Sequence, residues 1–386
     1  MKKYLISLIC LLYSGVIFTQ NEEYLIKEFK FHKGPVNSVD ISPDCQYLVS
    51  GGEDKDLVIT NLNSMETEHT YQNYFPPRAI KITRENKIFM GSGPDIKFID
   101  FNNKTLAVYK GNATYVWSID YGPERNIITA GSFDNKIKVW DVTTQKIKLV
   151  LEGHTKSTLP VAISPDEKYI VSGSLDRTIK IWNAQNGEIL KSLEGHSDNI
   201  YDIAFHPNGM YFASASRDQS IRLWYFSTGD VLVTYVGHDK AVMDIEFTPD
   251  GNHLLSASLD GTIRLWETKT GKMVYTFTGH ENGVNSIAVS SDGKYLASGG
   301  NDGRVKIWEL NKKIFVEFAY YDEFNAEKSK SGLFNPKQKD EKKIDYELRM
   351  KKAKTLEEQI VDDFYKKYIV ELNNKSFKSN INNEKK

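Results

Sequence analysis

Four sets of histidine, serine and aspartate recur along this chain, and these are the residue types of a hydrolase triad. In such a triad the histidine takes the proton of the serine hydroxyl, and the aspartate orients the histidine. The four sets are His154, Ser172 and Asp176; His196, Ser214 and Asp218; His238, Ser256 and Asp260; and His280, Ser298 and Asp302. Repetition argues against catalysis, because one fold needs one nucleophile and has no use for four copies at equal spacing.

The sets lie inside a repeat with a step of 42 residues. A Gly-His pair opens each of the last four copies, and a tryptophan follows each aspartate by six residues. The tryptophans at this position are Trp140, Trp182, Trp224, Trp266 and Trp308. A repeat of this length, with Gly-His near its start and Trp near its end, is typical of a β-propeller blade.

Residues 237–278 show how one unit is built. Apolar residues alternate in four short segments, and Pro249, Gly251 and Gly261 supply the turns between them. Four short antiparallel strands form a sheet that cannot bury both of its faces alone. We therefore expect the units to stack around a central axis.

Aligning the rest of the chain on this unit gives seven units over about residues 24–320. Their residues resemble the WD-repeat family, whose architecture is that of the heterotrimeric G-protein beta subunit. The resemblance implies an all-β fold, a seven-bladed β-propeller of four-stranded antiparallel blades. The match is best in the last five units and weakest over residues 72–110.

The same resemblance implies a structural role for the polar sets, which in this family form a buried hydrogen-bond network with the tryptophans. We therefore expect networks of His154, Ser172, Asp176 and Trp182; His196, Ser214, Asp218 and Trp224; His238, Ser256, Asp260 and Trp266; and His280, Ser298, Asp302 and Trp308. The third unit has Asn112 and Ala130 in place of the histidine and serine, and the first lacks the tryptophan. The N-terminal side of the ring should consequently be less rigid.

Closure of the ring has two candidate strands for the last blade. Residues 24–31 and residues 314–318 could each supply its outer strand. In the resembling family the N-terminus often does so, and we favour residues 24–31 here. An open ring would expose strand edges.

A binding surface is predicted on the face that carries the starts of the inner strands and the turns before the repeated aspartates. Two positions in each unit point outward there in the resembling family. In units three to six these positions hold Trp117, Phe133, Leu159, Leu175, Tyr201, Arg217, Met243 and Leu259. An apolar arc with Trp, Tyr, Met and Arg has the composition of an interface hot spot, so we expect a protein or peptide partner across it. The alternative is that these side chains pack on one another or that Trp117 lines the channel wall.

Other function classes find little support. The net charge of −1 gives no field that would attract nucleic acid. No close histidine pair, cysteine pair or phosphate-binding glycine loop is present, so we expect no metal, no cofactor and no enzymatic activity. A propeller hydrolase or lactonase would need an unrepeated cluster of acids or histidines in the channel, and we identify none in the sequence.

The N-terminal twenty residues resemble a secretory signal peptide. Lys2 and Lys3 precede an uncharged apolar run over residues 4–18, which is short for a membrane span. We expect removal of residues 1–20 and export to the periplasm, the cell envelope or the medium of a bacterium, with no span in the mature chain. The propeller would then occupy residues 21–320.

Residues 321–386 are expected to form a charged linker followed by an amphipathic helix. Apolar residues recur every fourth position, at Leu356, Ile360, Phe364, Tyr368 and Leu372. The helix could dock on the propeller, pair with a second copy, or bind another protein. The last option gives an alternative function, a structural subunit of an envelope or secretion assembly held through this helix.

Overall fold

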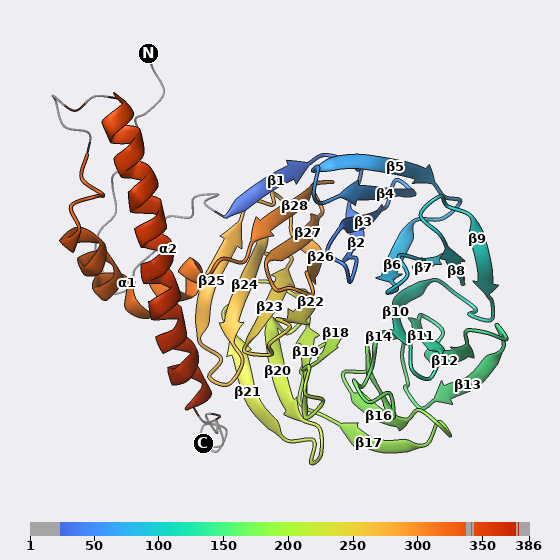
Figure 1. The fold of residues 1–386 in the computed structure, drawn as a ribbon. Helices are drawn as coiled ribbons and strands as arrows, with labels where there is room; N and C mark the ends of the chain where they lie inside the picture. The colour runs from blue at the N-terminus through green and yellow to red at the C-terminus, as the bar shows by residue number, and fades with distance from the viewer. Residues whose placement is uncertain (1–23, 337–340, 342, 376, 378–386) are drawn as a thin grey trace.

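The computed structural model describes residues 24–336, 341, 343–375 and 377. In these residues the chain forms a seven-bladed β-propeller beside which two C-terminal helices pack (Figure 1). Each blade is a sheet of four antiparallel strands, so the predicted fold class is confirmed. The signal peptide expected over residues 1–20 lies outside the described residues.

The strands of each blade follow one another along the chain from the inside of the ring outward, except in the last blade. Blade 1 is β2 (Val36–Ile41), β3 (Tyr47–Gly52), β4 (Asp56–Asn61) and β5 (Glu66–Gln72); blade 2 is β6 (Pro77–Ile82), β7 (Ile88–Ser92), β8 (Asp95–Ile99) and β9 (Thr105–Tyr109). Blade 3 is β10 (Val116–Gly122), β11 (Ile127–Ser132), β12 (Lys136–Asp141) and β13 (Ile147–Glu152); blade 4 is β14 (Thr158–Ile163), β15 (Tyr169–Ser174), β16 (Ile179–Asn183) and β17 (Ile189–Leu193). Blade 5 is β18 (Ile200–Phe205), β19 (Tyr211–Ser216), β20 (Ser220–Tyr225) and β21 (Val231–Val236); blade 6 is β22 (Val242–Phe247), β23 (His253–Ser258), β24 (Thr262–Glu267) and β25 (Met273–Thr278). Blade 7 is β26 (Val284–Val289), β27 (Tyr295–Gly300), β28 (Val305–Glu309) and β1 (Leu25–Phe29).

The seven inner strands contact one another in a closed circle, from β2 through β6, β10, β14, β18 and β22 to β26 and back to β2. Apolar side chains fill the spaces between neighbouring blades in separate clusters. This arrangement covers both faces of every small sheet. A bridge between Ser132 and Thr158 also joins blades 3 and 4 into one hydrogen-bonded sheet.

The N-terminal strand β1 closes the ring. It pairs antiparallel with β28, with Leu25 opposite Trp308 and Phe29 opposite Val305. The preference for residues 24–31 is thus confirmed. The alternative strand, residues 314–318, is helical, because β1 already fills the outer edge of β28.

Two helices follow the last blade: α1 (Lys312–Lys330) and α2 (Lys343–Asn373). The Asn311 side chain accepts a hydrogen bond from the Lys313 backbone N–H and caps the start of α1. The charged linker expected at the start of residues 321–386 is therefore wrong in part, since the chain, after a kink at Tyr320, is helical to Lys330. The polar, Lys-rich composition of residues 322–330 suits an exposed helix face as well as a linker.

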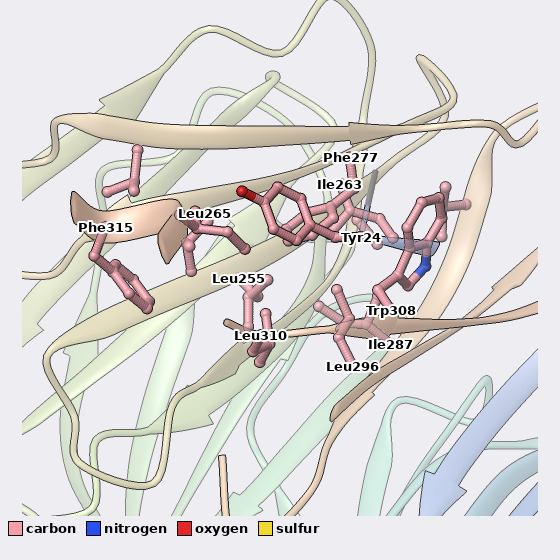
Figure 2. Close-up of a cluster of buried hydrophobic side chains, with 14 of the residues drawn as sticks. Tyr24, Leu255, Ile263, Leu265, Phe277, Ile287, Leu296, Trp308, Leu310 and Phe315 are labelled. Atoms are coloured by element: carbon pink, nitrogen blue, oxygen red, sulfur yellow. The ribbon is translucent and has the colours of Figure 1, made fainter. Parts of the chain in front are cut away.

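The apolar stripe of α2 packs against α1 and the propeller. Ile360 and Val361 lie against Val316 and Phe324 of α1, and Tyr368 and Leu372 join the core of blades 6 and 7. Figure 2 shows part of this core, where Phe315 of α1 lies near Leu265 and Leu310, and Tyr24 lies near Ile263 and Phe277. The stripe is buried within its own chain and is not free for a second copy in this conformation.

No helix within the described ranges is both long enough and apolar enough to cross a membrane.

Candidate functional site

Each polar set of blades 4 to 7 forms a chain of hydrogen bonds that ends on the tryptophan. In blade 4, His154 Nδ1 lies 2.9 Å from Asp176 Oδ2, His154 Nε2 lies 2.9 Å from Ser172 Oγ, and Trp182 Nε1 donates to Ser172 Oγ over 2.8 Å. An ionised aspartate only accepts hydrogen bonds, so Nδ1 carries the proton and Nε2 accepts from the serine hydroxyl. The loop before the inner strand supplies the histidine, and the turn between the second and third strands supplies the aspartate.

The same three contacts recur in the next three blades. They join His196, Ser214, Asp218 and Trp224; His238, Ser256, Asp260 and Trp266; and His280, Ser298, Asp302 and Trp308.

These sets are enclosed. The histidine side chains are at most 1% exposed, and the serines are fully buried. Burial raises the pKa of Asp176, but hydrogen bonds from His154, Thr178 and the backbone outweigh it and hold that pKa well below the ordinary range. A serine that accepts the indole N–H inside the blade cannot reach a substrate.

Blades 1 to 3 depart from this pattern, each differently. Blade 1 holds a set that the sequence analysis did not include: His32 lies 3.0 Å from Asp54 and 2.9 Å from Ser50. The histidine stands at the same distances along the chain as in the other sets, and that spacing was the available signal. Thr60 lies in β4 where the tryptophan would lie.

In blade 3 a lysine of the third strand replaces the histidine as the side-chain partner of the aspartate. Lys138 Nζ lies 2.5 Å from Asp134 Oδ2, and both side chains are at most 10% exposed. Trp140 Nε1 donates to the Lys110 carbonyl over 3.0 Å instead of to a serine.

The predicted binding arc lies on one face of the ring, which we call the top face: the face with the loops before the inner strands and the turns between second and third strands. Phe133 and Arg217 are exposed, and Trp117, Leu175, Tyr201, Met243 and Leu259 are half-buried. The Trp117 and Phe133 rings meet edge to face at 5.6 Å.

Leu159 does not belong to this surface, since it is only 2% exposed. Its carbonyl oxygen lies so close to Gly131 that a Cβ there would be 2.2 Å away. The bridge between Ser132 and Thr158 brings blades 3 and 4 together here, next to the buried Leu159. The prediction for Leu159 as an outward-facing contact was therefore wrong.

Three further aromatic residues extend the surface onto blade 2. Tyr74 is 77% exposed and contacts Phe75, which in turn contacts Tyr115, itself 44% exposed. They lie in the loops that lead into β6 and β10. Together with Trp117 and Phe133 they form what we call the aromatic patch. The weak repeat in blade 2 hid Tyr74 and Phe75 from an analysis by aligned positions.

A cavity of about 660 Å³ occupies the central channel. Trp117, Tyr201 and Met243 line it, so the alternative of Trp117 on the channel wall is also realised. Five carboxylic acids and a lysine on the inner strands line it as well: Asp40, Asp120, Asp202, Asp244, Glu246 and Lys81.

These carboxylates correct the expectation that the channel holds no acid cluster. They stand two or four residues after the first residue of an inner strand, the positions that face the axis because side chains alternate along a strand. The inward-facing positions could be assigned from the sequence. The residue types at these positions vary among the blades, however, so the acids gave no periodic signal.

Each of the five carboxylates ties its blade to the next. One oxygen accepts the backbone N–H of the neighbouring inner strand, at 2.7–3.0 Å. The donors are Ile82 to Asp40, Ile163 to Asp120, Ile245 to Asp202, Ile287 to Asp244 and Val289 to Glu246.

Burial raises the pKa of four of these carboxyl groups despite these bonds: Asp40, Asp202, Asp244 and Glu246. Burial raises the pKa of Glu246 to about 8, against the opposing effect of Lys81. Burial and the neighbouring Asp244 carboxylate raise the pKa of Asp202 well above its usual range. Among the described residues, no group of three or more His, Cys, Asp or Glu side chains is arranged to hold a metal ion.

Comparison with known proteins gives one family model, described as "WD domain, G-beta repeat". It matches residues 23–61, 103–141, 145–183, 187–225, 229–267 and 271–309. The unmatched stretch, residues 62–102, contains most of blade 2, the blade without the network.

Several proteins are similar over part of the chain. Identity is 30% to Periodic tryptophan protein 2 homolog of Dictyostelium discoideum, over 37% of this chain and 16% of that protein. It is 29% to Transcription initiation factor TFIID subunit 5 of Caenorhabditis elegans (34% and 20%), and 30% to Nuclear distribution protein nudF of Aspergillus flavus (29% and 26%). The chain thus spans less than a third of the length of each of these relatives. All three come from eukaryotes, which gives no support to the expected bacterial source.

Proposed function

The chain belongs to the WD-repeat family, since the six matched segments cover more than half of its residues, and from this premise we propose that it is a non-enzymatic scaffold for protein–protein interaction. The partner is a peptide or protein that lies across the top face, over the aromatic patch and the channel mouth. The site runs from blade 2 to blade 6 and so extends the predicted arc by one blade.

The exposure of the aromatic patch carries this proposal. Tyr74, Tyr115 and Phe133 are 77%, 44% and 39% exposed, and their neighbours Phe75 and Trp117 are half-buried. Clustered aromatic surface gains free energy when a partner covers it, and Trp and Tyr are enriched among residues that dominate binding. The blade network does not use Trp117, so packing within the blade does not explain its presence.

The names of the relatives agree with an interaction role. One relative is a subunit of TFIID, and another, 24% identical over 33% of this chain, is named Actin-interacting protein 1 in Drosophila melanogaster. Each name describes an assembly or a protein partner of that relative. For this chain it supports the class of function and leaves the partner to experiment.

The test compares one variant with a matched control. A partner is captured with the wild-type protein, purified, and titrated against each variant. Trp117→Ala should weaken its binding by about 2 kcal/mol, or about thirtyfold. Leu190→Ala removes a side chain that is 43% exposed on the outer strand β17 and should leave affinity unchanged. Equal affinities for wild type and Trp117→Ala would place the site elsewhere.

The alternative role, as a structural subunit held through the C-terminal helix, has a narrower basis. Two apolar side chains at the beginning of α2, Ile344 and Leu348, are 77% and 54% exposed, and Val370 near its end is 61% exposed. Deleting residues 344–386 would also remove the buried Tyr368 and Leu372, so it would not isolate this role. Ile344→Glu combined with Leu348→Glu removes the exposed apolar surface at the beginning of α2 and should not weaken partner binding if the top face is the site.

Export is a separate proposal, based on Lys2 and Lys3 and the uncharged run over residues 4–18. The eukaryotic relatives do not support a periplasmic location in particular. Intact-mass measurement of the protein from its native source should show that residues 1–20 have been removed. Retention of residues 1–18 would refute export by cleavage.

A further inference from the structure

The channel beneath the aromatic patch carries an excess of acidic groups. Six acidic side chains and two basic ones line it, which is a difference of four negative charges when all are ionised. The acids are Glu53 at the mouth and Asp40, Asp120, Asp202, Asp244 and Glu246 below it; the bases are Arg78 and Lys81. Arg78 pairs with Glu53 at 3.0 Å, so the mouth is neutral and the imbalance lies deeper.

The fold itself does not require this charge. At the positions equivalent to Asp202 and Asp244, blades 1, 3 and 7 carry Ser38, Ser118 and Ser286. Their hydroxyl groups accept the backbone N–H of the next blade at 3.1–3.4 Å, as the aspartates do. A neutral hydroxyl therefore suffices to join blades, and the presence of ionisable carboxyl groups at residues 202 and 244 must be explained by something else.

The charge is also unfavourable in the unliganded channel. Asp202 and Asp244 are close enough to hydrogen-bond one another, and burial together with this neighbour raises the pKa of Asp202. Lys81 is the one cation deep in the described channel, and its Nζ lies 3.9 Å from Asp120. An additional cation would lower the electrostatic free energy of the remaining carboxylates.

The channel mouth suits an organic cation with an apolar stem. Trp117, Tyr201 and Met243 line the cavity above the carboxylates, and a volume of about 660 Å³ exceeds that of one side chain. Aromatic faces attract cations, and the methylene groups of lysine and arginine pack against apolar surface.

From this geometry we propose that the partner inserts a lysine or arginine side chain into the channel, with its stem against Trp117, Tyr201 and Met243 and its charged head among the carboxylates. This inference rests on the proposed function, because the inserted side chain belongs to the peptide that crosses the top face. The partner segment is therefore basic at the point where it crosses the channel.

The test uses short probes and the full chain. Acetylated, amidated pentapeptides Ala-Ala-X-Ala-Ala, with X as Arg, Lys or Gln, are titrated by calorimetry. The Arg or Lys peptide should bind saturably and about tenfold or more tightly than the Gln peptide, since complementary charge discriminates partners. Equal binding of all three peptides, or binding of calcium chloride with no binding of the basic peptides, overturns the proposal.

Variants then locate the binding. Asp202→Asn with Asp244→Asn removes two ionisable groups but retains acceptors for the blade-joining bonds, and should weaken binding of the basic peptide at least tenfold. Asp202→Ser with Asp244→Ser, which copies blades 1, 3 and 7, serves if the first pair does not fold. Asp166→Asn with Asp292→Asn makes the same two substitutions in turns on the opposite face, and should bind like wild type. An equal loss in this control pair would show a general effect of net charge and overturn the proposal.

The two proposals can fail separately. If Trp117→Ala weakens binding of the purified partner but the aspartate variants do not, the top-face site stands and the inserted cation is refuted. If the basic peptide binds through Asp202 and Asp244, but neither the aspartate variants nor Trp117→Ala change the affinity for the partner, the channel site stands and the top-face function is refuted.

Discussion

Blades 4 to 7 and blades 1 to 3 are built on the same four strands but hold them together differently. In blades 4 to 7 the aspartate, histidine, serine and tryptophan form one repeated set of hydrogen bonds. Blade 1 lacks the tryptophan, blade 3 substitutes a buried lysine, and blade 2 has no such set. The helices α1 and α2 also pack on the regular side, against blades 6 and 7 (Figure 1).

The aromatic patch lies on the divergent side, over blades 2 and 3. The loop before β6 holds no network residue and carries Tyr74 and Phe75, whereas Phe133 lies next to Asp134, the partner of Lys138. The regular blades thus supply a rigid frame, and the divergent blades supply surface for recognition. Separation of this kind is expected, because a loop that binds must keep polar or aromatic side chains available.

The largest expected difference between the two sides is in the cost of losing a turn aspartate. Asp260 accepts bonds from His238, Thr262 and the Asp239 backbone, at 2.6–3.1 Å. Asp260→Ala leaves these donors without partners and should lower the free energy of unfolding by about 3 kcal/mol.

The matched variant is Asp100→Ala in blade 2. Asp100 accepts two backbone bonds in an exposed turn, so the loss should be below about 1 kcal/mol. Urea unfolding followed by circular dichroism measures both. Equal losses would remove the contrast between a networked and an unnetworked blade.

Much of this contrast could be predicted from the sequence, because the regular side is periodic. Repeats at 42 residues located the four polar sets and most of the seven blades, and the resemblance to the WD-repeat family indicated both the network role of these sets and the choice of residues 24–31 for closure. The helix α2 followed from apolar residues at every fourth position.

Features that occur once could not be found in the same way. The channel acids occupy inward positions, but Asp202 recurs only as Asp244 in blade 6, and Glu246 has no glutamate at its equivalents in other blades. The burial of Leu159 depends on a contact between two blades that no single repeat contains. Similarly, Tyr74 precedes a strand whose alignment was weak. Tertiary contacts decide these positions, and local patterns do not report them.

The regular side should also be the more sensitive to acid, through His253. This residue is 1% exposed, and its Nε2 lies 2.8 Å from the Tyr368 hydroxyl of α2. Burial lowers its pKa to about 4, partly opposed by Asp250 and Glu267. Because the folded pKa is below the unfolded value, the full stability is present above about pH 6.5 and is lost as pH falls toward 4.

At about pH 5 the loss from this one group should be about 2 kcal/mol relative to neutral pH. His253→Gln removes the titration, so its unfolding free energy should fall less between pH 7 and pH 5 than that of the wild type, in urea titrations at both values. Parallel losses in the two proteins would show that other groups cause the acid sensitivity.

The smallest expected effect concerns the substitute interaction in blade 3. Lys138 is 5% exposed, and its hydrogen bond with Asp134 is one cause of the lowered pKa of that carboxyl, against the opposing effect of burial. Lys138→Met keeps the length of the side chain but removes the charge, so Asp134 retains only its backbone donors, Ala113 and Lys136. The free energy of unfolding should fall by about 1 kcal/mol, less than for Asp260→Ala, because one partner is lost instead of several.

Lys136→Met is the control for this variant, since Lys136 pairs with Glu152 on the surface and its side chain is 45% exposed. Surface pairs contribute little, so this change should stay within about 0.5 kcal/mol of wild type. If Lys138→Met costs no more than Lys136→Met, the lysine does not replace the histidine network, and blade 3 is held by its apolar core alone. If it costs as much as Asp260→Ala, blade 3 belongs with the regular side, and the boundary between frame and recognition surface moves to blade 2.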